Sequence, residues 1–282
     1  MAFPYVGGKS RIGKWIYSQM PQKKWNIYAE IFGGAAWLWL KNPIVAKQVI
    51  YNDYNPFLYN LWTCLVFHRE EFRKHLGNDK LNDKPTFHSY KKFLIGIERD
   101  KKEEFLKSVP NFSVAAKYIY ILTHVFSGDF SGGQKLSENG YQAFLNKFTD
   151  DKFTKKFDAI TEVENMDCEK LIYLIDNKDV FLYLDPPYYG KENLYAFHNF
   201  TKEKHYSLAD KLKSCKAMWI LSYYDYPDLK DLYPVQDYIW LKKEYTRSSS
   251  SVKDKGAKGI EVLVYPKELE EMKNQGVNLF FK

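Results

Sequence analysis

Short runs of apolar, β-branched and aromatic residues recur along the chain, and polar or turn-forming residues bound each of them. Runs of this kind are typical of β-strands that are buried in a sheet. They predict seven strands, at residues 26–30, 48–52, 159–163, 180–184, 217–222, 238–242 and 261–265. Most are separated by segments long enough for a helix, which is the pattern of a wound α/β sheet. The last two are joined by one loop and are expected to pair antiparallel at a sheet edge.

A long interval between the second and third predicted strands breaks this alternation. It contains amphipathic patterns at Pro56–Phe67 and Val114–Phe126, followed by a Gly- and Ser-rich stretch. Because structureless loops of such length are uncommon, we expect a mostly helical insertion. The sequence thus predicts an α/β domain built from residues 1–54 and 155–282, with residues 55–154 inserted into it.

Composition narrows the class of protein. The formal net charge is +7, and basic residues gather at Lys9–Lys24 and Lys242–Lys258. This favours a polyanionic partner such as a nucleic acid, although such clusters are also ordinary solvated surface. No apolar run is as long as a membrane span, and the N-terminus lacks the apolar segment of a signal peptide. Three scattered cysteines indicate a reducing compartment, so we expect a cytoplasmic protein without membrane contact.

The most informative motif is Asp185-Pro186-Pro187-Tyr188, directly after a predicted strand. In an open α/β sheet, ligands bind where the strands end at their carboxyl edge. The prolines remove N–H donors, so a carboxylate and backbone carbonyls remain as acceptors, which suits a planar amine with two N–H bonds. Tyr188 adds an aromatic face for a planar base. The alternative is a rigid turn in which Asp185 caps a neighbouring group.

Two further motifs follow the first two predicted strands. In Glu30-Ile31-Phe32-Gly33-Gly34 the small residues let the backbone approach a ligand, without the G-x-G-x-x-G pattern of dinucleotide sites. Asp53 ends the second strand, where it either accepts bonds from ribose hydroxyls or caps the helix that begins near Pro56. A third motif, Pro4-Tyr5-Val6-Gly7-Gly8-Lys9-Ser10, is not a P-loop, because no strand precedes it and the first glycine is missing.

In this order and spacing, the motifs at Pro4–Lys9, Ala29–Gly34, Asn52-Asp53 and Asp185–Tyr188 resemble the Dam-type (D12 class) family of DNA adenine-N6 methyltransferases. The resemblance covers most of the chain. It implies a Rossmann-like methyltransferase fold with a seven-stranded, mixed, mostly parallel sheet. It also implies methyl transfer from S-adenosylmethionine to N6 of a flipped-out adenine in duplex DNA, with 55–154 as the target-recognition domain and a place in restriction-modification.

The resemblance also implies roles for individual residues. The catalytic group is Asp185, Pro186, Pro187 and Tyr188. The donor-binding group is Tyr5, Lys9, Glu30, Phe32, Gly33, Asp53, Asp167, Cys168 and Asp185. Where the family's glycine motif ends in Gly, this chain has Ala36, which we expect to narrow the approach to the donor slightly.

DNA contacts are expected from two segments. The turn-rich stretch Ser127–Tyr141 carries Gln134, Lys135 and Asn139, whose side chains are suited to base edges. An ordinary connecting loop is the alternative, which its position within the insertion makes the less favoured one. Arg247, Lys253 and Lys255 lie in a loop that either clamps phosphates or is merely mobile.

Two other functions stay open. One is a non-catalytic DNA-binding module that keeps the methyltransferase fold, and the other is an amine methyltransferase acting on RNA or protein. The six histidines show no metal-binding spacing, so we expect no metal site. We also expect a monomer.

Overall fold

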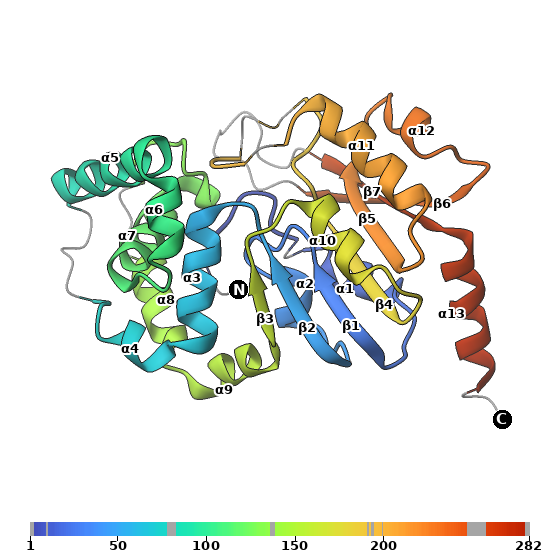
Figure 1. The fold of residues 1–282 in the computed structure, drawn as a ribbon, viewed down its shortest axis with the longest axis horizontal. Helices are drawn as coiled ribbons and strands as arrows, with labels where there is room; N and C mark the ends of the chain where they lie inside the picture. Colours follow the sequence, from blue (N-terminus) through green and yellow to red (C-terminus); the bar gives the residue numbers. More distant parts are fainter. Residues whose placement is uncertain are drawn as a thin grey trace.

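Seven strands form one mixed β-sheet at the centre of the protein (Figure 1). The computed structural model describes residues 3–9, 11–77, 83–135, 139–190, 192, 195–198, 200–246 and 258–279. The strands are β1 (Trp25–Glu30), β2 (Ala46–Asn52), β3 (Glu162–Glu164), β4 (Val180–Leu184), β5 (Met218–Tyr224), β6 (Tyr238–Thr246) and β7 (Lys258–Pro266). Their order is β3-β2-β1-β4-β5-β7-β6, with β1 to β5 parallel and β7 antiparallel to both neighbours. The predicted sheet, including its antiparallel edge pair, is confirmed.

Helices cover both faces of this sheet, because neighbouring residues of each central strand point to opposite sides. Tyr28 and Phe181 belong to one buried cluster, whereas Ala29 and Leu182 belong to the other. The first cluster is completed by α1 (Gly13–Ser18), α2 (Trp37–Lys41) and α13 (Lys267–Leu279). The second is completed by α10 (Cys168–Ile175), α11 (Lys202–Lys213) and α12 (Leu229–Leu232). The result is a three-layer α/β/α arrangement.

The segment between β2 and β3 is helical, as its periodicity predicts. It contains α3 (Pro56–Phe67), α4 (Arg69–Arg73), α5 (Lys84–Asp100), α6 (Lys102–Lys107), α7 (Phe112–Thr123), η1 (Phe126–Gly128), α8 (Asn139–Phe148), α9 (Asp151–Thr154) and η2 (Lys155–Ala159). Helix α3 begins where the Asn55 side chain accepts bonds from the N–H groups of Phe57 and Leu58, and Pro56 occupies its first turn. Within the described part of the chain, no helix is both long and apolar enough to span a membrane.

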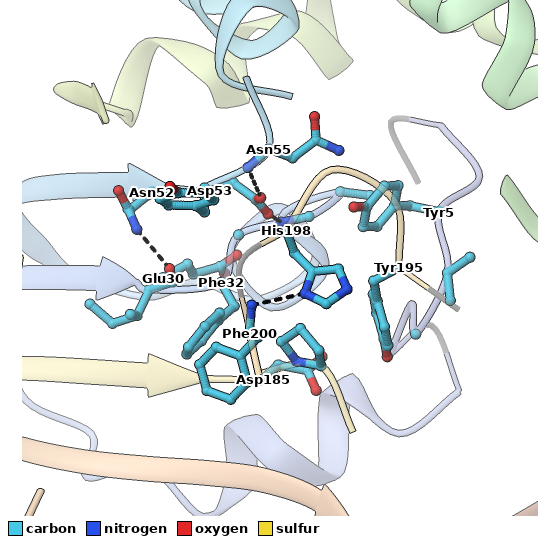
Figure 2. A pocket seen from close by; sticks show the side chains of 18 of the residues that line it. Tyr5, Glu30, Phe32, Asn52, Asp53, Asn55, Asp185, Tyr195, His198 and Phe200 are labelled. Atoms are coloured by element: carbon cyan, nitrogen blue, oxygen red, sulfur yellow. Dashed lines mark hydrogen bonds between the residues drawn. The ribbon is translucent and has the colours of Figure 1, made fainter. Parts of the chain in front are cut away.

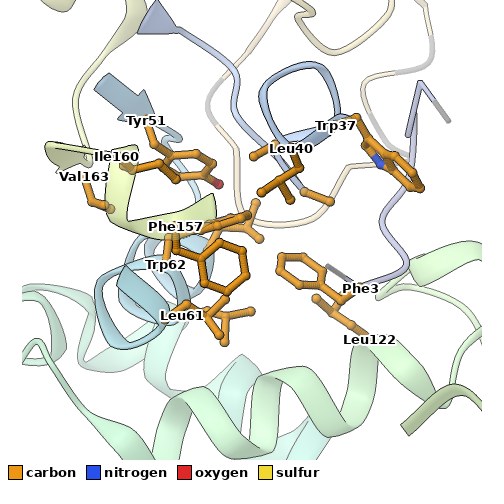
Figure 3. Close-up of a cluster of buried hydrophobic side chains, with 14 of the residues drawn as sticks. Phe3, Trp37, Leu40, Tyr51, Leu61, Trp62, Leu122, Phe157, Ile160 and Val163 are labelled. Carbon is orange, nitrogen blue, oxygen red and sulfur yellow. The ribbon is translucent and has the colours of Figure 1, made fainter. Parts of the chain in front are cut away.

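The inserted helices share a core with the sheet (Figure 3). The ring of Trp62 on α3 lies 4.9 Å from that of Tyr51 on β2 and 5.6 Å from that of Phe157. The contact between Trp62 and Phe157 also explains why the third strand begins later in the sequence than the predicted 159–163. Residues 155–159 form η2, which brings Phe157 under Trp62, so that β3 begins only at Glu162.

The N-terminal segment, residues 3–9, passes between the insertion and the turn that follows β1. Gly128 of η1 has φ +71°, and a Cβ atom there would lie 2.4 Å from the carbonyl oxygen of Pro4. On the other side, a Cβ at Gly34 would lie 3.1 Å from the ring of Tyr5. The segment is therefore in close contact with both parts of the molecule.

Candidate active site

A pocket opens at the carboxyl ends of β1, β2 and β4 (Figure 2). Its walls are completed by the N-terminal segment together with Tyr195, Ala196, His198 and Phe200. Of the residues expected at the donor and catalytic sites, those that line it are Tyr5, Lys9, Glu30, Phe32, Gly33, Asp53, Cys168, Asp185 and Pro187. Pro186, Tyr188 and Asp167 are not among its lining residues. The motifs that lie far apart in the sequence therefore converge at the sheet edge where the wound-sheet rule places a ligand.

Asp53 joins two backbone turns at this edge. Its Oδ2 accepts a 2.9 Å bond from the N–H of Gly34, and its Oδ1 accepts one of 2.9 Å from the N–H of Asn55. Burial raises the pKa of Asp53 to about 6. Because Asn55 itself caps α3, the alternative of Asp53 as the helix cap is wrong. Each carboxylate oxygen keeps a second lone pair for a ligand.

Glycine is required beside Asp53 for reasons of space. A Cβ at Gly33 would lie 2.2 Å from the ring of Tyr51, and Gly34 adopts φ +49°. Ala36 also lies in the left-handed region, with φ +48°, although it is not glycine. Its methyl group is buried in the core, and Ala36 does not line the pocket. The expectation that Ala36 narrows the approach to a ligand is therefore wrong.

Glu30 lies at the end of β1 with only 3% of its surface exposed. Its Oε1 accepts bonds from the N–H of Trp39 at 2.7 Å and from the hydroxyl of Tyr28 at 3.0 Å. The first of these bonds satisfies an N–H group in the opening turn of α2. Burial raises the pKa of Glu30 to about 7, so its charge is easily gained when a cation approaches.

Asp185 and Lys9 form the charged centre of the site. Asp185 follows β4, and its Oδ1 lies 2.7 Å from Nζ of Lys9. Nζ also lies 3.3 Å from Oε1 of Glu261, on β7, and donates to the carbonyl of Gly7 at 3.2 Å. Burial raises the pKa of Asp185 to about 7 against the opposing effect of Lys9. Burial alone would lower the pKa of Lys9, but the charges of Asp185 and Glu261 raise it well above its ordinary value.

Tyr188 is held at the side of this centre. Its hydroxyl donates to Oε1 of Glu261 at 3.0 Å and accepts from Lys9, and Nζ of Lys9 lies 4.8 Å from the centre of its ring. The ring also packs against Tyr224 at 5.3 Å. Other aromatic side chains line the pocket itself, namely those of Tyr5, Phe32, Trp37, Tyr54, Tyr183, Tyr195 and Phe200.

Several pocket residues were not identified from the sequence. Asn52 accepts from the N–H of Met166 at 2.8 Å and donates to the carbonyl of Ile31 at 2.9 Å, which ties three strand ends together. His198 accepts from the N–H of Phe200 at 2.9 Å (Figure 2). Tyr195, His198 and Phe200 follow the Asp-Pro-Pro-Tyr motif closely, and their position in an aromatic-rich stretch was the available signal. Glu261 lies beside the pocket without lining it, and the available signal was an acidic residue at the start of the strand predicted at 261–265.

Asp167 and Cys168 differ in their relation to the pocket. Cys168 is 5% exposed and lines it, and burial raises the pKa of its thiol to about 12, so it forms a neutral wall. Asp167 instead caps α10 by accepting from the N–H of Glu169. Asp167, Cys168 and Glu169 form the one group with metal-ligand spacing among the described residues. The ammonium of Lys204 lies 2.7 Å and 3.3 Å from its two carboxylates.

The residues expected to contact DNA lie away from the pocket or outside the described structure. Gln134 forms an isolated bridge with Val125, and its amide atoms are buried without a hydrogen-bond partner in the described part of the chain. Lys135 is exposed, and its Nζ lies 5.9 Å from the ring of Phe126. Asn139 is the first residue of α8. Arg247, Lys253 and Lys255 lie outside the described residues.

The chain is similar to known proteins over most of its length. The model of a family described as D12 class N6 adenine-specific DNA methyltransferase matches residues 5–248. The Type II methyltransferase M1.LlaDCHI of Lactococcus lactis subsp. cremoris is 23% identical over 279 residues. That alignment covers 92% of this chain and 93% of the relative.

Proposed function

Because the chain belongs to the D12 class of N6 adenine-specific DNA methyltransferases, we propose that its pocket binds S-adenosylmethionine and that Asp185 receives the target amine. The observation that carries this proposal is the position of Asp185. Its carboxylate lines the pocket at the end of β4, beside the ammonium of Lys9. A methyl acceptor held there would face a donor bound over β1 and β2.

The charges and shape of the pocket fit a cationic donor. Its lining includes three carboxyl groups, Glu30, Asp53 and Asp185, and one ammonium, Lys9. S-adenosylmethionine supplies a methyl group on a positively charged sulfur, from which an amine can take it directly. The glycine turn gives its backbone access to the ligand, and Asp53 offers acceptors for ribose hydroxyls. Phe32 and Phe200, whose rings meet edge to face at 5.3 Å, offer an apolar wall for its adenine.

Asp185 is the group that acts on the target. The N6 amine of adenine is a poor nucleophile, because its lone pair is delocalised into the ring. A carboxylate that accepts an N6–H bond stabilises the positive charge that develops on nitrogen, and this effect is strongest in a site shielded from water. The carbonyl of Pro186 would accept the second N–H bond. Alignment of N6 with the methyl group supplies a further share of the rate.

Residues 55–154 are proposed as the target-recognition domain, since they are joined to the sheet at the edge where the pocket opens. The target base must leave the duplex to reach Asp185, and base contacts must come from a separate surface. Lys135 is exposed and suited to guanine acceptors. Gln134 would have to turn its buried amide group outward, and Asn139 would act from the start of α8.

We therefore expect Lys135→Ala to relax the preference at one base pair, by about 1–3 kcal/mol of discrimination. The control is Lys107→Ala on α6, which removes the same charge from another exposed position of the insertion. The measurement is methylation of a randomised duplex library by both variants. An unchanged preference in Lys135→Ala, with only a uniform loss of rate, would place recognition elsewhere in 55–154.

The direct test of the proposed function is incubation with methyl-labelled S-adenosylmethionine and duplex DNA, followed by digestion to nucleosides. Label in N6-methyladenine is the expected result. Duplex binding without transfer would instead support a DNA-binding module that has kept the fold. In view of the Type II relative, we further propose a role in restriction-modification, with the protein acting as a monomer in the cytoplasm.

A further inference from the structure

Glu261 is a buried acid next to the proposed catalytic residue. It lies on β7 opposite Tyr224 of β5, with 1% of its surface exposed. The strand residues that follow it, from Val262 to Tyr265, are apolar and buried. Burial of a carboxylate is costly unless every oxygen is bonded or paired, so its presence here calls for a function.

Three groups converge on the Glu261 carboxylate. The hydroxyl of Tyr188 lies 3.0 Å from Oε1 and 3.3 Å from Oε2. The buried hydroxyl of Ser222 donates to Oε1, and Nζ of Lys9 lies 3.3 Å from it. Of these three partners, Lys9 also pairs with Asp185 at 2.7 Å. One ammonium therefore serves two carboxylates.

This sharing has a chemical consequence. If Lys9 faced Asp185 alone, the two would form a closed ion pair, and the Asp185 carboxylate would be a weaker acceptor for a further N–H bond. A second carboxylate on the same ammonium leaves the cluster with an excess of negative charge. The bond to Tyr188 also fixes the last residue of the Asp-Pro-Pro-Tyr motif to the sheet.

We propose that Glu261 is a positioning residue for methyl transfer, which shares Lys9 with Asp185 and fixes Tyr188 so that Asp185 remains a strong acceptor for the target amine. The inference rests on the proposed function and adds a residue to it. Glu261 does not line the pocket, so it acts through Lys9 and Tyr188 rather than on the substrate.

The electrostatics around Asp185 agree with this role. Burial has the largest effect on the pKa of Asp185 and raises it, Lys9 lowers it, and the charge of Glu261 raises it again. The titratable groups that face Asp185 are Lys9 from the N-terminal segment, Glu30 from β1, Tyr183 from β4, Tyr188 and Tyr195 after β4, Tyr223 from β5, and Glu261 from β7. Removal of the Glu261 charge should therefore lower the pKa of Asp185.

The first test needs no methyl transfer. Carboxyl-labelled aspartate is incorporated into the ligand-free protein, and Asp185→Asn identifies the Asp185 signal in the carbon NMR spectrum. In Glu261→Gln we expect its titration midpoint to fall by about one pH unit. Glu244→Gln, which removes an exposed carboxylate paired with Lys258 on the same sheet edge, should leave the midpoint unchanged. An unmoved or raised midpoint in Glu261→Gln overturns the proposal.

The second test is the single-turnover rate against pH. We expect the plateau rate of Glu261→Gln to fall about tenfold or more. The fall of the rate at low pH, which we assign to protonation of Asp185, should move to lower pH. Duplex affinity should be retained. A lower plateau rate without a shift of the low-pH fall would indicate a merely structural role and overturns the proposal. If Glu261→Gln does not fold, Glu261→Asp serves instead, because it keeps the charge but withdraws it from Lys9 and Tyr188. A reduced plateau then supports the proposal, and a wild-type plateau overturns it.

These tests separate the inference from the function on which it rests. If the wild-type protein transfers no methyl group to DNA, the proposed function fails and this inference with it, whatever the titration shows. If the wild-type protein is active and Glu261→Gln matches it in both midpoint and rate, only the inference fails.

Discussion

The Asp185 carboxyl group is subject to two opposed influences. Burial favours its neutral form, whereas the ammonium of Lys9 favours the carboxylate. Groups balanced in this way are common at catalytic positions, because a small change in their surroundings changes their protonation state. A bound cationic donor would add to the effect of Lys9 and favour the carboxylate that the target amine needs.

Asp185→Ala should therefore abolish methyl transfer, with a loss of roughly 3 kcal/mol or more in transition-state stabilisation. Duplex binding should persist, since we expect the phosphate contacts to come from other residues. The control is Asp237→Ala, an exposed residue just before β6, at the opposite edge of the sheet. Transfer within a factor of about ten of the wild-type rate would remove Asp185 from the proposed role.

At the level of elements, the turn between β1 and α2 is the most tightly packed part of the site. Gly33→Ala would force the Tyr51 ring from its place, and with it the contact between Tyr51 and Trp62 that joins sheet and insertion. We expect a loss of about 1–3 kcal/mol in stability from this overpacking, together with weaker donor binding.

The matched variant is Gly96→Ala in α5, where a Cβ would meet nothing within 4 Å. It should raise stability by about 0.5–1 kcal/mol, as expected for alanine in a helix. Denaturant unfolding of both variants provides the measurement. Equal stability changes would contradict the packing argument.

The strands could be predicted because their local signal and their environment agree. Residues 180–184 are apolar throughout, and all five are buried in β4. The strand predicted at 159–163 was misplaced because a distant contact, between Phe157 and Trp62, decides where η2 ends. The convergence of Lys9, Asp53 and Asp185 followed from the wound-sheet rule, whereas the role of Glu261 depends on the antiparallel register of β7 against β5. No local pattern encodes a pairing between residues so far apart.

Over the whole molecule, we expect the buried acids to make both stability and donor binding depend on pH. The folded-state pKa values of Glu30 and Asp53, about 7 and about 6, lie above their ordinary values of 4.5 and 3.8. A raised carboxyl pKa gives stability that is fully present below the ordinary value and is lost as pH rises through the folded value. In the ligand-free protein, the contribution of these two acids to stability should therefore be lost between about pH 4 and pH 7.

A cationic donor should reverse this trend, because it favours the ionised carboxyls. We expect the stabilisation by S-adenosylmethionine to grow from pH 5.5 to pH 7.5, about the range in which these groups ionise. The neutral thioether product should show a smaller increase. Thermal unfolding with each ligand across this range is the measurement, and equal pH dependence for both ligands would contradict the assignment of these acids to the donor site.

The contact between Gly128 and Pro4 joins the insertion to the pocket. Gly128→Ala adds a side chain where φ is +71° and the carbonyl of Pro4 is close, so it should displace the segment that carries Tyr5 and Lys9. We expect donor affinity to fall by roughly tenfold or more, since small displacements at a ligand site have large effects. Gly133→Ala, with open space around it, should bind donor normally. Calorimetric titration of both variants tests this, and unchanged affinity in Gly128→Ala would contradict it.

We expect that same contact to link the binding of DNA and donor thermodynamically. If DNA held by the insertion shifts η1, and η1 shifts residues 3–9, then the occupancy of one site alters the affinity of the other. Linkage is reciprocal, so the factor by which DNA changes donor affinity equals the factor by which the donor changes DNA affinity. If both ligands stabilise the same arrangement of residues 3–9, each raises the affinity for the other. Loss of the methyl group would then loosen its hold on the DNA it has just modified.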